Sequence, residues 1–593
     1  MVNTILHRLK AQAAERPTEP AYYRKTGGQW VGTNWKSYYD QVRSAAKALL
    51  ALGYNSGEVV TILGFNTPEW VVFDLAGMMA GGAAAGIYAT NSPQEVQYIV
   101  DHCDSPYLLL EDEKQWAKVE QELDKLPSLR KVIMMPGAPA IDHELVLSWE
   151  AFNKLGADVP DGELDERFNS LTEKGLATLI YTSGTTGPPK GVMLSHENLF
   201  WTSVTATNLF GITPSDSSLS YLPLSHIAEQ MFTIHGPINV GWRVYYAESP
   251  TSVADNLKEV TPSIVFGVPR VWERFYNGVS AKLGEATGVK AKLITWARSV
   301  GRQMIHLRNE GRQPSAILTM QYNLADKLVF ANLRQALGLS NMKVCASGAA
   351  PISKEIVEFF GSLGIVIYEI YGQSEGSGPS TINYPKNTRF GSVGKTIPGT
   401  EVKIAEDGEV LVKGPHVFLG YFKNEAATES TLIGDYLYSG DLGQFDEDGY
   451  LWITGRKKEI IITSGGKNIA PANIEAALKD MELVNDAIII GDQRKFLSAL
   501  ITLEPEALAR FAAANGLEMD DLHENPAVVK AVEAMVEEVN KNFARVENIR
   551  RFRLLPAPFS VEGGELTPTL KLKRRIVYKK YWDTIESIYE GVD

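Results

Sequence analysis

Short apolar runs alternate with longer amphipathic stretches along most of the chain. The runs are rich in β-branched and aromatic side chains, and they predict buried strands at residues 59–65, 107–111, 131–134, 177–183, 263–268 and 365–371. Between them, residues 35–52 and 353–363 repeat apolar side chains at helical spacing. Strands that alternate with helices favour mostly parallel sheets covered by helices on both faces. A long charged stretch at residues 275–339 is predicted to be a helical insertion.

The pattern changes after about residue 401. Closely spaced strand-like runs with Asp- and Gly-rich turns predict antiparallel hairpins, and thus a small β-subdomain, at residues 409–413, 450–455 and 459–463. From residue 458 the chain has its own strands and helices, predicted at residues 471–480, 487–491, 498–503 and 526–542. We therefore predict an α/β fold with a large N-terminal domain, residues 1–457, and a smaller α+β C-terminal domain, residues 458–593.

Composition narrows the class of protein. The 593 residues include 58 Lys and Arg against 71 Asp and Glu, and a net charge of −13 argues against nucleic acid as a partner. Only two cysteines are present, which excludes a disulfide framework and indicates a reduced, cytoplasmic protein. Residues 71–90 are nearly uncharged apart from Asp74. Their many small residues favour a buried helix packed against a sheet over a membrane span.

The clearest local motif is Tyr-Thr-Ser-Gly-Thr-Thr-Gly-Pro-Pro-Lys-Gly at residues 181–191. Glycines relax the backbone, while hydroxyl groups and a lysine supply donors for phosphate oxygens. It is not a Walker A loop, because Lys190 is followed by Gly191 instead of Ser or Thr. A loop that is merely flexible would not need so many hydroxyls. The predicted phosphate-binding residues are Thr182, Ser183, Gly184, Thr185, Thr186 and Lys190.

This loop resembles the phosphate-binding loop of the adenylate-forming superfamily, which includes acyl-CoA synthetases, firefly luciferase and nonribosomal-peptide adenylation domains. Further motifs of that superfamily recur in order from residue 177 to residue 575. The stretches at residues 220–230, 268–275 and 563–575, together with the long insertion after residue 275, look most like long-chain fatty-acid CoA ligases, and most closely resemble those of the bubblegum type. The resemblance implies ATP and CoA as substrates, Mg²⁺ as cofactor and a mobile C-terminal domain.

The motif Tyr-Leu-Pro-Leu-Ser-His at residues 221–226 resembles the family's substrate-side motif. The resemblance implies that His226 lies near the reacting carboxylate, where an imidazole can orient it. Outside such a motif a lone histidine is usually structural. The motif Ser-Gly-Ala-Ala-Pro at residues 347–351 resembles the adenine-contacting loop, which implies that Gly348, Ala349 and Ala350 let the backbone approach the base.

The sequence Tyr-Gly-Gln-Ser-Glu-Gly at residues 371–376 fits two motifs. As G-x-S-x-G it matches the nucleophile elbow of α/β-hydrolases, but that motif needs a following helix, and the next residues are rich in Gly and Pro. The family resemblance instead implies that Tyr371 stacks on adenine and that Gly372 belongs to the nucleotide-binding residues. It also implies that Ser374 lies near phosphate and that Glu375 binds Mg²⁺.

Two further motifs resemble the family's ribose and hinge segments. Tyr-Ser-Gly-Asp-Leu-Gly at residues 438–443 implies that Asp441 accepts hydrogen bonds from both ribose hydroxyls, although an aspartate in a hairpin turn is the plain alternative. In Gly-Arg-Lys-Lys-Glu at residues 455–459, Arg456 matches a ribose and phosphate contact and Lys458 the hinge. Gly466 belongs to a second glycine-rich loop, assigned by resemblance to the CoA half-site.

The last motif, Gly-Glu-Leu-Thr-Pro-Thr-Leu-Lys-Leu-Lys-Arg-Arg at residues 564–575, departs from the family pattern, which ends in Gly-Lys. Alignment of Thr567 and Arg574 selects Lys571 as the catalytic lysine, with Lys573 as the alternative. An ammonium there would stabilise an anionic transition state. A basic patch for a membrane or nucleic acid is the competing interpretation, and both roles are compatible.

Together these residues predict an ATP-dependent long-chain fatty acid–CoA ligase that works through an acyl-adenylate. Two alternatives remain: an enzyme that passes the acyl group to a carrier protein, and a non-catalytic nucleotide or fatty-acid binder. The expected partners are fatty acid, ATP and CoA, with no nucleic acid. Peripheral membrane contact and the oligomeric state stay open.

Overall fold

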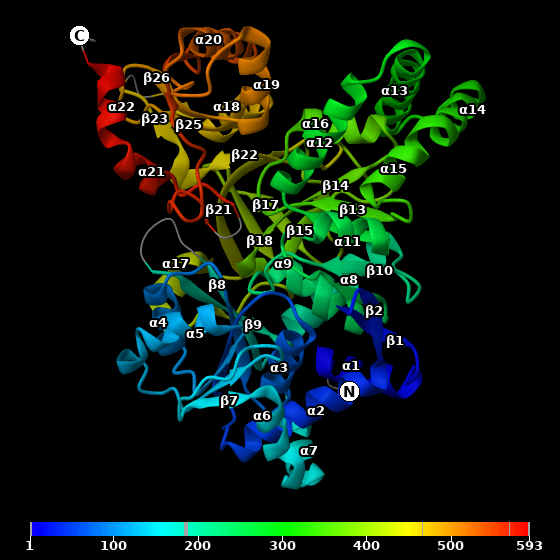
Figure 1. The fold of residues 1–593 in the computed structure, drawn as a ribbon, viewed down its shortest axis with the longest axis vertical. Helices are drawn as coiled ribbons and strands as arrows, with labels where there is room; N and C mark the ends of the chain where they lie inside the picture. The colour runs from blue at the N-terminus through cyan, green and yellow to red at the C-terminus, as the bar shows by residue number, and fades with distance from the viewer. Residues whose placement is uncertain (1–2, 183–187, 465–466, 568–569, 591–593) are drawn as a thin grey trace.

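The computed structural model describes residues 3–182, 188–464, 467–567 and 570–590. Within these ranges two large sheets form the body of the molecule (Figure 1). The nine-stranded sheet has the order β16-β15-β14-β13-β12-β10-β11-β1-β2 and the eight-stranded sheet the order β19-β9-β8-β4-β3-β5-β6-β7. The nine-stranded sheet is parallel in the middle and antiparallel at both edges. The eight-stranded sheet is parallel from β8 to β7 and antiparallel from β8 through β9 to β19. The parallel parts are as expected from the alternation of strands and helices.

The strands of the nine-stranded sheet are β1 (Pro20–Thr26), β2 (Gln29–Asn34), β10 (Ser217–Ser220), β11 (Arg243–Tyr246), β12 (Ile264–Gly267), β13 (Val344–Ser347), β14 (Ile367–Gln373), β15 (Gly378–Ile382) and β16 (Lys395–Thr396). Those of the eight-stranded sheet are β3 (Val59–Leu63), β4 (Ala83–Ile87), β5 (Tyr107–Leu110), β6 (Lys131–Met134), β7 (Val146–Ser148), β8 (Leu176–Thr182), β9 (Lys190–Ser195) and β19 (Gly420–Tyr421). The six strands predicted in this part of the sequence are all present, with shifts of a few residues at their ends.

Helices cover these sheets. The helices of the first half are α1 (Ile5–Glu15), α2 (Trp35–Ala51), α3 (Pro68–Met79), α4 (Pro93–His102), α5 (Glu113–Glu120), α6 (Trp149–Leu155), α7 (Asp161–Asn169), α8 (His196–Phe210), α9 (Ile227–Gln230), α10 (Gly236–Val240) and α11 (Val253–Val260). The predicted insertion consists of α12 (Pro269–Gly284), α13 (Gly288–Asn309), α14 (Ala316–Ala325) and α15 (Ala331–Leu337), and it is followed by α16 (Lys354–Ser362).

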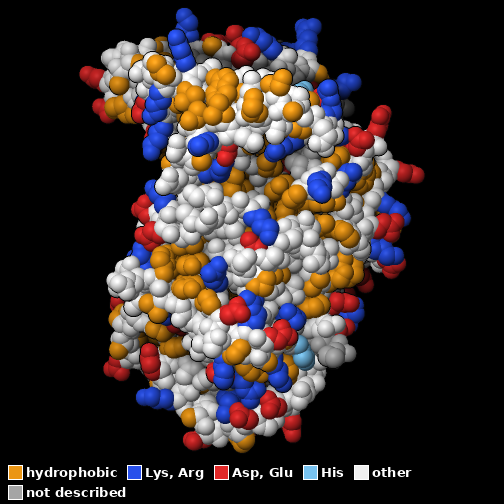
Figure 2. All heavy atoms as spheres, turned by 90° about the vertical axis from the view of Figure 1, so that its right-hand side faces the viewer, with side chains coloured by type: hydrophobic (Ala, Val, Ile, Leu, Met, Phe, Trp, Pro, Cys, Tyr) orange, Lys and Arg blue, Asp and Glu red, His pale blue; other side chains and the backbone are white. Residues whose placement is uncertain are grey.

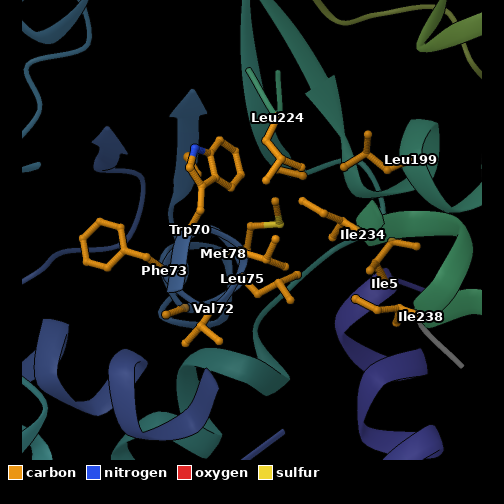
Figure 3. Packing of buried hydrophobic residues seen from close by; sticks show 14 of the residues in the cluster. Ile5, Trp70, Val72, Phe73, Leu75, Met78, Leu199, Leu224, Ile234 and Ile238 are labelled. Carbon is orange, nitrogen blue, oxygen red and sulfur yellow. The ribbon is translucent and has the colours of Figure 1, made fainter. Parts of the chain in front are cut away.

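The largest hydrophobic core lies between the two sheets, because it includes side chains of both, such as Ile62 and Val244. Helix α3 runs through this core, and its Trp70, Phe73 and Met78 are fully buried. Trp70 and Met78 lie on the side of Leu224 and Ile234, whereas Phe73 points to the opposite side (Figure 3), where it packs against Phe152 of α6. Two other clusters cover the outer faces of the sheets, one under α4 and α5 and one under α12 to α16.

The prediction of one long helix over residues 71–90 is wrong in part. Helix α3 ends at Met79, and β4 begins at Ala83 after a turn in which Gly81 has a φ of +91°. Close packing on a sheet was correctly predicted, since a Cβ at Gly77 would lie 2.7 Å from a methyl carbon of Val60 in β3. No helix among the described residues is long and apolar enough to cross a membrane.

The predicted β-subdomain is a five-stranded antiparallel sheet of β17 (Glu401–Ile404), β18 (Glu409–Lys413), β20 (Leu432–Ile433), β21 (Tyr436–Phe445) and β22 (Leu451–Arg456), with α17 (Glu425–Thr431) beside it. The strand predicted at residues 459–463 is reduced to β23 (Ile461–Ile462), paired with β24 (Asn468–Ile469).

The C-terminal segment forms its own layers, at the top of Figure 1. A three-stranded sheet of β25 (Val484–Ile490), β26 (Leu497–Leu503) and β27 (Ile549–Leu555) has apolar clusters on its two faces. Its helices are α18 (Pro471–Lys479), α19 (Pro505–Asn515), α20 (Pro526–Asn540), α21 (Arg574–Lys580) and α22 (Trp582–Tyr589).

Candidate active site

One cavity of about 2850 Å³ gathers every predicted site residue that the structure describes. That volume is several times the roughly 300–1,000 Å³ of common ligand pockets, so it has room for more than one substrate. The lining residues include Thr182, Lys190, His226, Gly348, Ala349, Ala350, Tyr371, Gly372, Ser374, Glu375, Asp441, Arg456, Lys458, Lys571 and Lys573. The predicted residues Ser183, Gly184, Thr185, Thr186 and Gly466 lie outside the described ranges.

The fold brings these residues together because many of them follow the carboxyl ends of strands. The segments after β10, β13 and β14, which run parallel in one sheet, carry His226, the loop at residues 348–350 and Glu375. In open α/β sheets ligands bind outside the carboxyl ends of the strands. The chemistry-bearing motifs therefore meet at one edge although they are far apart in sequence.

Close backbone approach at this edge requires small residues. A Cβ at Gly372 would lie 1.7 Å from the carbonyl oxygen of Gly378, and one at Gly348 would lie 2.9 Å from that of Ile370. Ala349 has a φ of +70°, a region that residues with a side chain rarely adopt. Larger side chains at Gly348, Ala349 or Gly372 would therefore move the backbone at this edge of the cavity.

The structure excludes the hydrolase interpretation of Ser374. Residues Ser374–Gly376 form one short 3₁₀ turn, and the chain then returns as β15, antiparallel to β14. A nucleophile elbow needs a helix after the turn. Ser374 therefore belongs to a hairpin, as the Gly- and Pro-rich sequence indicated.

Asp441 is the centre of a hydrogen-bonded group. It lies opposite Arg456 in the pairing of β21 with β22, and the Arg456 Nε donates to its Oδ1 over 2.7 Å. The hydroxyl of Tyr371 donates to Oδ2 over 3.0 Å. The Asp441 charge raises the pKa of Arg456, and burial keeps the pKa of Tyr371 well above its usual range. The group thus holds a carboxylate and a guanidinium at fixed positions in the cavity wall.

Lys190 and Glu375 are linked through Tyr421. The Tyr421 hydroxyl donates to Glu375 Oε1 over 2.8 Å, and the Lys190 ammonium lies 4.7 Å from the centre of the Tyr421 ring. Lys190, near the end of the phosphate-loop motif, is the first residue of β9, so the tyrosine positions both a cation and a carboxylate. Tyr421 was not predicted, since nothing in its local sequence distinguishes it from a core aromatic.

His226 is neutral in this structure. The backbone N–H of Ala228 donates to its Nδ1 over 3.1 Å, which caps α9. Burial, and after it the Lys571 charge, lowers the pKa of His226 to about 3. Because Nδ1 accepts a hydrogen bond, the single ring proton is on Nε2, where it is available to an acceptor in the cavity.

Lys571 reaches the same part of the cavity. The Lys571 side chain lines the cavity and is exposed to it. Desolvation by the surrounding protein, followed by the charge of Arg456, lowers its pKa to about 8. The carboxylates of Asp441 and Glu375 oppose this shift. Lys573 also lines the cavity, and its backbone N–H donates to the Glu565 carbonyl oxygen over 2.7 Å.

The segment that carries Lys571 is anchored to the rest of the C-terminal segment. Arg574, three residues later, donates to both carboxylate oxygens of Glu475 over 2.7 and 2.8 Å and to the carbonyl oxygen of Ile489 over 3.1 Å. The Lys571 N–H donates to the Thr567 hydroxyl over 2.9 Å. These contacts tie Lys571 to the C-terminal segment, so the position of Lys571 follows that of the whole segment.

The buried carboxylates Glu409 and Glu229 were not predicted. Glu409 accepts hydrogen bonds from the Gly440 N–H and from Lys457, and so holds the turn before Asp441. Glu229, one turn after His226, accepts from the Thr233 hydroxyl and the Tyr221 N–H, and burial raises its pKa to about 8. The only sequence signal was a carboxylate inside an otherwise apolar or strand-like run.

A second set of lining side chains is hydrophobic, and we call it the apolar part of the cavity. Phe232 and Phe266 stack with ring centres 5.0 Å apart. Phe232 belongs to a π-helical segment, Met231–His235, between α9 and α10, and such segments are often found at functional sites. The apolar part consists of Ala206, Phe210, Ile212, Met231, Phe232, Ile264, Phe266 and Val344.

The cavity also lies at a junction between α12 and the C-terminal segment. Arg270 of α12 forms a short ion pair with Asp486 of β25 and donates to the carbonyl oxygen of Asn485 over 3.1 Å. Glu273 lies 3.3 Å from Lys479 of α18, which is 3.7 Å from Asp486. We call these four residues, Arg270, Glu273, Lys479 and Asp486, the junction charges.

The chain matches known protein families over most of its length. The AMP-binding enzyme family matches residues 9–422, and the AMP-binding enzyme C-terminal domain matches residues 458–593. The long-chain-fatty-acid–CoA ligase ACSBG2 of Xenopus laevis is 40% identical over 600 residues, which cover 95% of this chain and 81% of that protein. The ACSBG2 protein of Homo sapiens is 37% identical and covers 96% of this chain and 90% of its own.

Solved structures share the fold. An anthranilate CoA ligase, AuaEII, in complex with anthranoyl-AMP superposes with a TM-score of 0.73 at 20% identity, over 99% of this chain and 98% of that chain. The adenylation domain of a carboxylate reductase from Mycobacterium chelonae gives a TM-score of 0.76 at 20% identity, over 99% of this chain and 91% of that chain.

Proposed function

The chain belongs to the AMP-binding enzyme family, and we propose from this that it is an ATP-dependent long-chain fatty acid–CoA ligase. The single observation that carries the proposal is the cavity that unites His226, Glu375, Asp441 and Lys571 from distant parts of the sequence. Its relatives with 37% and 40% identity are long-chain-fatty-acid–CoA ligases by name. The apolar part of the cavity suits an aliphatic chain.

The first half-reaction joins the fatty acid to AMP. The substrate carboxylate attacks the α-phosphorus of ATP, pyrophosphate leaves, and a mixed anhydride results. In this proposal Asp441 accepts hydrogen bonds from the ribose hydroxyls, and Arg456 contacts ribose and phosphate. The small residues 348–350 and Tyr371 hold adenine, and Gly372 and Ser374 shape the turn beside the phosphates. Thr182 and Lys190 belong to the phosphate loop.

His226 and Lys571 act on the reacting groups. The Nε2–H group of the neutral imidazole donates a hydrogen bond to the substrate carboxylate and orients it toward phosphorus. The Lys571 ammonium neutralises charge that develops between the carboxylate and the α-phosphate. The alignment of Thr567 and Arg574 with the family motif supports Lys571 over Lys573 for this role.

Glu375 suits a Mg²⁺ ion that is shared with ATP. Among the described residues no three His, Cys, Asp or Glu side chains form a group suited to a metal, so a single protein carboxylate would hold the ion together with phosphate oxygens. Mg²⁺ often binds in this way, since it keeps water and substrate oxygens as its other ligands. When bound, the ion offsets the negative charge of the phosphates.

The second half-reaction transfers the acyl group to CoA. The CoA sulfur attacks the acyl carbonyl and AMP leaves, because a mixed anhydride is a far better acylating agent than a carboxylate. We propose that residues 1–457 and 458–593 are separate domains and that the second turns about Lys458 between the half-reactions. That turn removes Lys571 and brings up the CoA-binding face of the second domain. We also propose that the protein is cytoplasmic and contacts a membrane at its surface.

A panel of carboxylates from acetate to very long chains tests the function. With Mg²⁺ and ATP present, we expect CoA-dependent release of AMP and acyl-CoA in the mass spectrum, greatest for long chains. Acyl-adenylate that accumulates without acyl-CoA would favour transfer to a carrier protein. No release of pyrophosphate with any acid would indicate a non-catalytic binder.

A further inference from the structure

Helix α14 and the helical residues after it expose an apolar stripe. The side chains of Ile317, Met320, Leu324 and Leu328 are 67%, 67%, 50% and 44% exposed. Their spacing of three, four and four residues places them on one helix face. The other face is buried in the core under α12 to α16, through residues such as Leu318 and Phe330. This helix is therefore apolar on its inner and its outer face.

Exposed hydrophobic side chains are ordinary when they are scattered, but a continuous stripe marks an interaction site. Figure 2, which faces the side of the molecule on which α13 to α15 project in Figure 1, shows hydrophobic side chains gathered in a band across the upper part. Lys and Arg side chains surround that band. Within the described part of the chain, the four side chains of the stripe remain uncovered.

The charge of this region is opposite to that of the whole chain. Residues 288–337 contain eight Lys and Arg and two acidic residues, a net charge of 8 − 2 = +6, whereas the chain as a whole has −13. The remainder therefore has −13 − 6 = −19. Both acidic residues, Glu310 and Asp326, pair with arginines of the same region. Lys327 is exposed between Leu324 and Leu328, so a cation stands within the stripe itself.

We propose that residues 316–337 dock on the surface of an anionic lipid bilayer, with the apolar stripe in the boundary between headgroups and acyl chains. An amphipathic helix with Lys and Arg beside an apolar face binds in that way. The concentration of positive charge on an acidic protein matches an anionic surface and would orient the molecule toward it. A second copy of the chain would place this net charge of +6 against another +6, and the two would repel. Nucleic acid would leave the apolar stripe exposed to water.

Vesicle flotation with the full chain and no substrates tests the proposal. We expect the protein to float with vesicles that contain phosphatidylglycerol and to stay in solution with pure phosphatidylcholine. Met320→Asp combined with Leu324→Asp should weaken partitioning about tenfold or more. Lys327→Gln should weaken it about fivefold. The matched control is Met519→Asp, at a methionine of the C-terminal segment that is 61% exposed.

The outcomes separate cleanly. The proposal would be overturned if the double variant floated as well as the unchanged protein, or if the unchanged protein did not float at all. A concentration-dependent dimer in sedimentation equilibrium that the double variant loses would also overturn it, because the occupant would then be a second copy. Ligase activity toward a water-soluble short-chain acid should be the same in all variants. That assay verifies folding and keeps this inference separate from the proposed function.

Discussion

In the polar part of the cavity, Tyr371, Asp441 and Arg456 hold one another through directional hydrogen bonds of 2.7 to 3.0 Å. In the apolar part, Phe232 and Phe266 are held only by packing. A polar group depends on a few atoms at fixed distances, so one substitution removes its function. A hydrophobic surface depends on shape and area, so one substitution changes how much substrate fits. The predictions below test this difference, from the largest expected effect to the smallest.

Lys571→Ala should lower the rate of adenylate formation about 10² to 10³-fold, because it removes a charge that stabilises the transition state. Formation of the thioester from supplied acyl-AMP should be spared. Pyrophosphate release and acyl-CoA formation measure the two steps. Lys573→Ala is the matched control and should stay near the unchanged rate. Equal loss in both assays, or a larger loss for Lys573→Ala, would contradict the assignment.

Asp441→Asn should raise the KM for ATP about thirtyfold, since a hydrogen bond to a charged partner contributes about 2 kcal/mol. It leaves the guanidinium of Arg456 without its anionic partner. Steady-state kinetics with varied ATP measure the effect. Asp448→Asn, at an aspartate that is 65% exposed, is the control in the same subdomain. An unchanged KM for ATP would remove Asp441 from the nucleotide site.

Adenylate formation should fall about tenfold from pH 7 to pH 9. Burial lowers the pKa of Lys571 to about 8, so its ammonium is present below that pH and is lost as the pH rises through it. His226, whose pKa burial lowers to about 3, stays neutral across this range. Lys571→Arg should abolish the alkaline decline, because a guanidinium stays charged. A decline that persists in this variant would belong to another group.

Ala206→Phe should shift substrate preference about fivefold toward shorter acids, because it reduces the volume of the apolar part. The ratio of kcat/KM for a C8 and a C16 acid measures the shift. The KM for ATP should not change. Ala513→Phe, at an exposed position on α19, is the control. A change in the KM for ATP without a change in the C8 to C16 ratio of kcat/KM would show that the polar and apolar parts of the cavity are not independent.

The same difference determined what the sequence could predict. Asp441 and Lys571 could be assigned to one site because each is a charged residue within a series of motifs that resembles a known superfamily in order, and both line the cavity. The lining residues Phe232 and Phe266 were not found, since an aromatic residue that lines a cavity has the same local pattern as one in a core. Tyr421 and Glu409 were missed for a related reason: each acts through a contact with a residue that is distant in sequence.

Strands were easier to predict than their connections. The run at residues 131–134 matches β6, because a buried parallel strand is a short apolar run with clear ends. The segment at residues 71–90 misled, because a fully buried helix and a fully buried strand have similar composition. Only the turn at Gly81 divides it, and a single glycine among many small residues gives a weak signal.

The junction charges have a consequence for turnover. Arg270 and Lys479 alternate with Glu273 and Asp486, so each charge has opposite neighbours. When the C-terminal segment swings in the proposed cycle, the two pairs that cross the junction, Arg270 with Asp486 and Glu273 with Lys479, must separate together, and dissolved ions can then screen the charges that lose a partner. Ionic strength should therefore change the rate at which the enzyme passes from one half-reaction to the other, independent of how tightly the substrates bind.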